Sequence, residues 1–114
     1  MAFTIQAGRL LSERTDLTTN SETAVLGAVT SRTIVKLIRC VEYTGATPSL
    51  TILITDKDGN DWYLRGTTAM TAYQTVSIED FVLNAGDTLN VTASNANDVQ
   101  VFVDYFAADK TAGR

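Results

Sequence analysis

The sequence predicts a single all-β domain: a β-sandwich, jelly-roll-like, with about eight antiparallel strands and one short helical turn. Three observations predict this fold class. Apolar and polar residues alternate with a period of two along much of the 114-residue chain, whereas helical periods are scarce. Clusters of Gly, Asn, Asp and Ser separate the alternating runs every ~8–12 residues, as in sandwiches and barrels. Thr, which is β-branched and suits the solvent-facing side of a strand, occurs 18 times.

The strands follow from this alternation. The predicted strands are residues 3–6, 9–17, 23–29, 33–43, 50–55, 62–65, 72–78, 88–93 and 99–105, of which 9–17 has the poorest pattern. Asp58-Gly59 between two alternating runs indicates a hairpin, because Gly accepts the positive φ that such turns require. Residues 66–71 are rich in small side chains and are expected to form a loop. Residues 77–81 are expected to form the helical turn, with Ser77 as its cap and two acidic residues in its first turn.

Residues 33–43 form the strongest strand pattern of the first half of the chain. Strict alternation places Val35, Leu37 and Val41 on one face and Ile34, Ile38 and Cys40 on the other. Apolar residues on both faces indicate a central strand or one that a neighbouring subunit covers.

Length and composition are those of a globular protein that folds without cross-links. The chain fits one domain, residues 1–114, in which roughly two-thirds of the unfolded surface becomes buried. Hydrophobic residues make up 45% and charged residues 19% of the chain, which is not the composition of a disordered protein. The single cysteine, Cys40, cannot form an internal disulfide and is expected to be a small core or interface residue.

Several functional classes are disfavoured by the residues. The net charge is −4 and nine basic residues are scattered, which argues against nucleic acid and anionic membranes as partners. The chain has no histidine, which excludes Ser-His-Asp and Cys-His catalysis and histidine-ligated zinc. It also lacks a glycine-rich phosphate loop, a signal peptide and a long apolar span. We therefore expect a protein that is not an enzyme, needs no cofactor and folds in a cytosol-like compartment.

Two groups of side chains are candidate ligand sites. Asp56, Asp58, Asn60 and Asp61 offer oxygen ligands for calcium, but their spacing departs from the calcium-loop pattern and suits a hairpin turn. Trp62 and Tyr63 should point to opposite faces of their strand, one inward and one outward. Tyr43, Tyr63 and Tyr73 could form an exposed platform for sugars, with ordinary packing as the alternative reading.

The beginning of the chain is rich in apolar side chains. Residues 1–11 are a candidate N-terminal arm that lies across a neighbouring subunit, and pairing within its own sheet is the alternative. The residues predicted to contact another subunit are Phe3, Ile5, Leu10, Leu11 and Tyr43. Residues 107–114 are small and polar and are expected to form a flexible tail.

Two stretches of the sequence resemble small β-sandwich virion proteins of tailed phages. The first is the strand at residues 33–43 followed by residues 49–55, Asp58-Gly59 and Trp62-Tyr63-Leu64. The second is residues 77–89, in which a short turn ends in Leu83 and leads to Ala85-Gly86-Asp87-Thr88-Leu89 and a strand. Together they cover roughly residues 23–106.

The resemblance implies a structural role on a virus particle. It implies a capsid decoration (cement) protein that stabilises the head by non-covalent binding to the major capsid protein, assembled in the host cytoplasm and located on the virion. It also implies a homo-oligomer, expected to be a trimer. Two alternatives stay open: a tail or head–tail accessory protein, and a module that binds a carbohydrate or a receptor.

Overall fold

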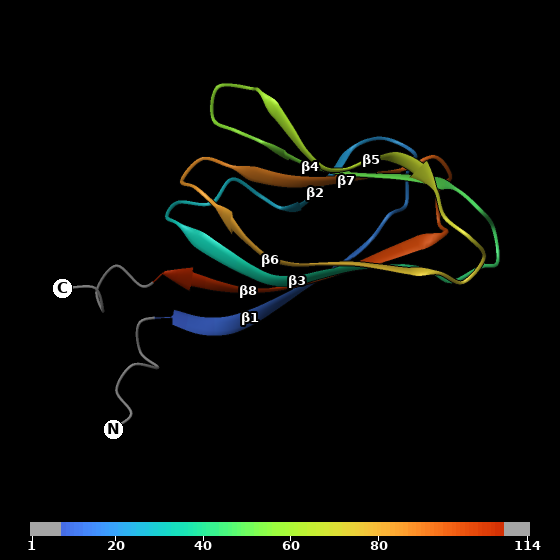
Figure 1. The fold of residues 1–114 in the computed structure, drawn as a ribbon, viewed down its shortest axis with the longest axis horizontal. Coiled ribbons are helices and arrows are strands. Elements are labelled where there is room, and N and C mark those ends of the chain that lie inside the picture. Colours follow the sequence, from blue (N-terminus) through green and yellow to red (C-terminus); the bar gives the residue numbers. More distant parts are fainter. Residues whose placement is uncertain (1–7, 109–114) are drawn as a thin grey trace.

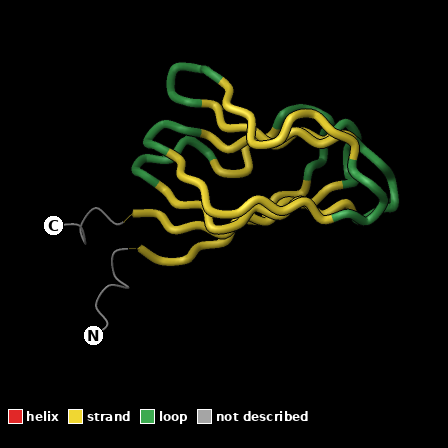
Figure 2. The backbone as a smooth tube through the Cα atoms, in the orientation of Figure 1, coloured by secondary structure: helices red, strands yellow, loops and turns green. Residues whose placement is uncertain are grey.

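The computed structural model describes residues 8–108, which form eight antiparallel strands in two sheets packed face to face (Figure 1). The strands are β1 (Gly8–Asp16), β2 (Thr23–Leu26), β3 (Thr33–Glu42), β4 (Ser49–Thr55), β5 (Asp61–Ala69), β6 (Thr75–Leu83), β7 (Thr88–Ala93) and β8 (Val99–Ala108). Within these residues all connections are loops and turns, and there is no helix (Figure 2). The all-β sandwich is confirmed. The expected strand at residues 3–6 lies outside the described residues.

The order of the strands makes this sandwich a jelly roll. Sheet A has the order β1-β8-β3-β6, and sheet B has the order β2-β7-β4-β5. Each strand of the first half therefore pairs with one of the second half: β1 with β8, β2 with β7, β3 with β6 and β4 with β5. The chain is in effect one long hairpin wrapped into two sheets. The two ends of the described chain consequently leave the molecule at the same end of sheet A (Figure 1).

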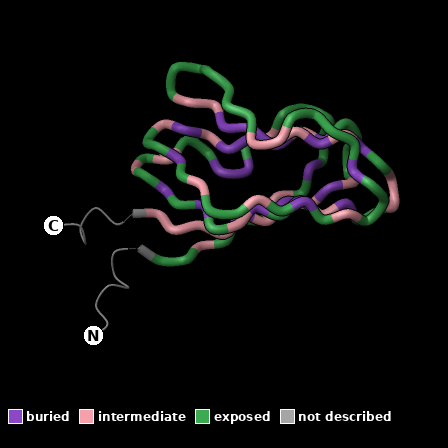
Figure 3. The backbone as a smooth tube through the Cα atoms, viewed as in Figure 1, coloured by how far each residue is buried: buried purple, intermediate pink, exposed green. Residues whose placement is uncertain are grey.

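The hydrophobic core lies between the two sheets. Figure 3 shows that buried positions occur along strands of both sheets. The four central strands supply most of it, three residues each: Val35, Ile38 and Cys40 of β3; Val99, Val101 and Val103 of β8; Leu50, Ile52 and Ile54 of β4; and Leu89, Val91 and Ala93 of β7. Cys40 is fully buried there, as expected of a small core residue. Burial of these apolar side chains is the main stabilising contribution to the fold.

The faces predicted for β3 are wrong, because the strand contains a bulge. The register of β3 against β8 shifts by one residue after Val35, so that Lys36 is an extra residue. Core-facing side chains are therefore three residues apart at this point, from Val35 to Ile38, before the period of two resumes at Cys40. Strict alternation groups Ile34 with Ile38, whereas Ile34 faces outward and is 44% exposed.

The helical turn predicted for residues 77–81 is absent, because these residues belong to β6. Eight residues of β6 pair with β3, which satisfies far more backbone groups than one helical turn could. Asp80 has φ = 58° within the strand and lies opposite the bulge of β3, where its carboxylate binds Lys36. The cap-like acidic pattern thus marks an irregular strand position.

The predicted loop at residues 66–71 is also different in the structure. β5 continues through Gly66 to Ala69, and its pairing with β4 contains register shifts on either side of Ile52. Small and polar side chains suit this position because β5 is an edge strand whose residues are largely exposed.

Candidate functional site: the outer face of sheet A

An apolar row crosses all four strands on the outer face of sheet A. Residues that pair directly across antiparallel strands project to the same face, and the pairs Leu10–Phe106, Phe106–Ile34 and Ile34–Val82 are all observed. Leu10 is 60%, Ile34 44% and Val82 47% exposed, and Phe106 is half-buried. We call Leu10, Phe106, Ile34 and Val82 the apolar row.

The apolar row is bordered by a band of charged side chains. Lys36 Nζ lies 2.8 Å from Asp80 Oδ1 on the exposed surface, and this contact raises the pKa of Lys36. Glu79 of β6 and Asp104 of β8 lie opposite Leu37, the next residue of β3. These charged residues line a shallow depression, together with Leu37 and the two members of the apolar row that belong to β1 and β8. The surface therefore combines an apolar patch with a polar border, as protein interaction sites do.

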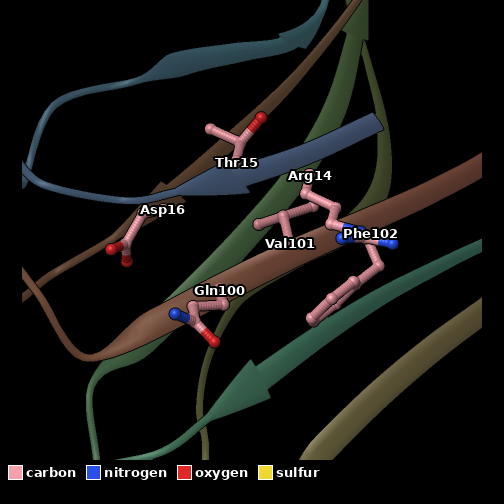
Figure 4. Close-up of a pocket in the computed structure, with 6 residues that line it drawn as sticks. All are labelled: Arg14, Thr15, Asp16, Gln100, Val101 and Phe102. Carbon is pink, nitrogen blue, oxygen red and sulfur yellow. The ribbon is translucent and has the colours of Figure 1, made fainter. Parts of the chain in front are cut away.

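A third level of the same face carries two arginines around one aromatic ring. Arg14 of β1 and Arg39 of β3 both pair with Phe102 of β8, and the Arg39 guanidinium lies 5.2 Å from the ring centroid. Figure 4 shows Arg14 beside Phe102 in a depression formed by β1 and β8, with Asp16 and Gln100 at its other end. A cation over an aromatic ring is attracted to the ring. Phe102 therefore helps to keep the positively charged Arg39 side chain on this part of the face.

A buried carboxylate lies where β3 ends. Glu42 is 1% exposed and accepts hydrogen bonds from the backbone N–H groups of Tyr73, Thr44, Gly45 and Ala46, at 2.7–3.1 Å, and from the Thr44 hydroxyl. Burial acts to raise the pKa of Glu42, but these hydrogen bonds outweigh it and lower the pKa to about 2. Glu42 therefore joins the loops that follow β3 and β5, which is a structural role.

Three of the candidate calcium ligands, Asp56, Asp58 and Asn60, lie in the turn of the β4–β5 hairpin, and Asp61 is the first residue of β5. Asp56 Oδ1 accepts hydrogen bonds from the N–H groups of Asp58 and Asn60, and Asp56 Oδ2 accepts one from the Trp62 indole. These bonds, that of the indole first, lower the pKa of Asp56. Asp61 accepts a hydrogen bond from Thr55. In the part of the chain that the structure describes, no three acidic, His or Cys side chains are grouped closely enough to hold a metal ion.

The prediction that one of Trp62 and Tyr63 faces inward is wrong. Trp62 and Tyr63 are 62% and 63% exposed, so neither is buried, although alternation predicts that one of them faces inward. The reason is that β5 is an edge strand, and these two residues pair with the end of β4, next to the turn of the hairpin. Tyr73, at 69% exposure, lies in the next loop, and its hydroxyl approaches Gly45.

The residues predicted to contact another subunit have different surroundings. Leu10 belongs to the apolar row, whereas Leu11 is half-buried on the inner side of β1. Tyr43 is 40% exposed just beyond β3, where partial burial and the carboxylates of Asp16 and Asp98 raise its pKa. Residues 8–11 of the candidate arm pair with β8 of the same molecule. Phe3 and Ile5 lie outside the described residues, and so do residues 109–114 of the predicted tail.

The residues predicted to contact another subunit do not include the other three members of the apolar row. Ile34, Val82 and Phe106 come from strands that are distant in the chain, and the row exists only because β8 and β3 are neighbours. A prediction of which strands pair with residues 33–43 would have been needed to find the apolar row from the sequence.

The thiol of Cys40 has no features of a nucleophile. Burial is the larger influence and raises its pKa to about 12, despite the opposing charge of Arg65. A thiol with this pKa is protonated at neutral pH. The structure thus assigns Cys40 to packing.

The comparisons with known proteins identify the fold. No model of a protein family and no curated protein matches the sequence. Similar solved structures include the nucleoplasmin-like N-terminal domain of Drosophila FKBP39, with TM-score 0.56, 10% identity, and 94% of this chain and 95% of that chain covered. A protein of Bacillus endospore appendages, which form disulfide-linked pili, has TM-score 0.54, 8% identity and 89% of both chains covered.

A third similar structure is a pentameric capsid protein from metagenomic phage sequences. It has TM-score 0.51 and 19% identity, with 96% of this chain and 67% of that chain covered. At these identities the three similarities establish a shared fold.

Proposed function

We propose that this chain is a structural protein of a tailed-phage virion, a decoration protein that binds the major capsid protein on the head through non-covalent contacts. The observation that carries the proposal is the apolar row, which places four large apolar side chains on the outer face of sheet A. Leaving such a patch in water is unfavourable, and a partner that covers it gains the free energy of burial.

Two further observations support a role on the particle. The chain shares its fold with a capsid protein of phage origin. The sandwich is a suitable scaffold for such a role, because a face of paired strands presents a broad and rigid surface with little conformational entropy to lose on binding.

The test is binding to heads assembled from the major capsid protein of the source phage. The purified protein is mixed with these heads, and co-sedimentation is measured for the wild type, for Ile34→Asp and for Ala24→Asp. Ala24 is an exposed strand residue on sheet B and gives a matched control. We expect the wild type and Ala24→Asp to bind and Ile34→Asp to lose at least tenfold in affinity, because a carboxylate would be buried without a partner.

Circular dichroism of the three proteins separates loss of binding from loss of fold. Equal binding of Ile34→Asp and the wild type would refute the apolar row as the contact. Binding of the wild type to purified tails, and not to heads, would favour the tail or head–tail accessory alternative.

A carbohydrate- or receptor-binding module is the second candidate, and the exposure of Trp62 and Tyr63 favours it. Exposed aromatic rings can stack on sugars. Trp62 is the only tryptophan, so its fluorescence reports directly on binding at the β4–β5 hairpin. A saturable change on titration with oligosaccharides, abolished in Tyr63→Ala, would support this candidate.

A rise in Tm with added calcium would support metal binding at Asp56, Asp58, Asn60 and Asp61.

A further inference from the structure

The four edge strands of the sandwich differ in how well they are protected. A free edge offers unpaired backbone N–H and C=O groups, which proteins usually block with short strands or bulges. β2 has four residues, β5 pairs through register shifts, and β6 contains Asp80 at φ = 58°. β1 has nine residues and keeps one unbroken register with β8 along its whole length. Among residues 8–108, no strand pairs with the other edge of β1.

The side chains of β1 are complementary to a second copy of the same strand. Arg9, Leu11 and Glu13 share the inner side of the strand, with Leu11 midway between the two exposed charges. In an antiparallel pair of β1 strands centred on Leu11, Arg9 of each copy lies opposite Glu13 of the other. The neighbouring registers that keep the faces aligned are less favourable. Centring on Leu10 puts Arg9 opposite Leu11, centring on Ser12 puts Leu11 opposite Glu13, and centring on Glu13 puts two carboxylates together.

We propose that β1 is a docking edge for a second copy of this chain. Two molecules pair antiparallel through β1, centred on Leu11, and their two A sheets become one eight-stranded sheet. The contact combines backbone hydrogen bonds with two symmetric Arg9–Glu13 pairs, and it is isologous, since the same edge is used by both copies.

This pairing brings the apolar rows of the two copies together. On the outer face, Leu10 of one copy lies opposite Ser12 of the other, so the two Leu10 residues are diagonal neighbours at about 7–8 Å. If the proposed function holds, the dimer offers the capsid a row twice as long. The self-association itself does not depend on a capsid and is measured without one, so the two proposals can fail separately.

The test is a charge exchange in the full-length chain. Sedimentation velocity over a range of concentrations is recorded for the wild type, Arg9→Glu, Glu13→Arg and the double variant Arg9→Glu/Glu13→Arg. Each single variant creates two like-charge pairs and should weaken dimerisation roughly tenfold or more, whereas the double variant restores opposite charges and should dimerise like the wild type. Both positions are exposed, so the fold should be retained.

Cysteine cross-linking checks the register. Cα atoms directly opposite each other in an antiparallel pair lie about 4.5–5.5 Å apart, within the range that a disulfide spans. Leu11→Cys should therefore form a disulfide-linked dimer on mild oxidation, and Arg14→Cys, whose two copies would be far apart, should not. Native Cys40 is fully buried and contributes no background.

Three results would overturn the proposal. They are a wild-type chain that is monomeric at all concentrations, single charge variants that associate as tightly as the wild type, and a trimer in which Leu11→Cys does not cross-link. The last result would instead support the trimer expected from the resemblance.

Discussion

Glu42 is placed so that its charge, and not merely its shape, is needed by the surrounding loops. Four backbone N–H groups point at its two oxygens, and a carboxylate can accept all of these bonds, whereas an amide would turn an NH2 group toward some of the donors. A donor facing a donor in a buried site leaves both groups unsatisfied. The loops that follow β3 and β5 therefore depend on one ionised side chain.

We predict that Glu42→Gln lowers the Tm at pH 7 and flattens the acid side of the stability profile. The pKa of Glu42 is lowered in the folded protein to about 2, from an ordinary value of 4.5. Its contribution is therefore complete above about pH 5 and is lost as the pH falls through the range from 4.5 to about 2. Thermal unfolding at a series of pH values measures both effects. Glu22→Gln, at an exposed loop carboxylate, is the control and should follow the wild type.

No feature of the sequence marks Glu42 among the thirteen acidic residues of the chain. It looks like one polar residue at the end of a strand, and one of the N–H groups that bind it comes from a loop 31 residues away in sequence. Cys40 is different, because a small apolar residue in a strong strand pattern is usually buried whatever the topology. At the scale of single residues, the sequence predicts apolar burial better than polar burial.

At the scale of elements, the bulge of β3 decides which side chains enter the core. Ile38 is fully buried and Ile34 is 44% exposed, although they are four residues apart and would share a face in a regular strand. Lys36 and Asp80 lie opposite each other at this irregularity and form an ion pair. The bulge thus turns the beginning of β3 so that Ile34 joins the apolar row.

We predict that Ile38→Ala and Ile34→Ala have very different costs. Removing the buried side chain of Ile38 should lower the free energy of unfolding by about 2–5 kcal/mol, because it leaves a cavity. Ile34→Ala should cost no more than about 1 kcal/mol in the isolated chain. Urea unfolding of both variants measures the difference. Similar costs for the two variants would mean that Ile34 is also part of the core in solution.

The strands themselves could be predicted because their alternation is local, whereas bulges are a response to neighbouring strands. The prediction of a helical turn at residues 77–81 is wrong for the same reason. Pairing of eight β6 residues with β3 is more favourable than the helical turn that the local cap pattern indicates. Similarly, β5 runs further than expected because its partner β4 continues beside it. Boundaries and faces are therefore decided by pairing that the local sequence does not encode.

At the scale of the whole molecule, the sequence predicts the sandwich but not the order of its strands. The apolar row depends entirely on that order, because it draws one residue from each of β1, β8, β3 and β6. In the sequence each of the four is simply one apolar residue in a different strand. The surface on which the proposed function rests is a product of topology.

We predict that a chain ending at Asp98, which lacks β8, does not fold. β8 lies between β1 and β3, so its removal separates sheet A into parts and uncovers the core side chains of both sheets. Circular dichroism and resistance to proteolysis measure the loss. A chain ending at Ala108 is the control and should fold, because it keeps all eight strands. A folded chain lacking β8 would contradict the central position of this strand.

The position of β8 also has a consequence for the order in which the protein is made. Of the eight described strands, the one synthesised last is an inner strand of its sheet, so sheet A cannot be completed until β8 has been made. A prematurely terminated chain therefore yields no smaller version of the domain that could occupy a place in an assembly. Only chains that contain β8 can therefore fold and enter an assembly.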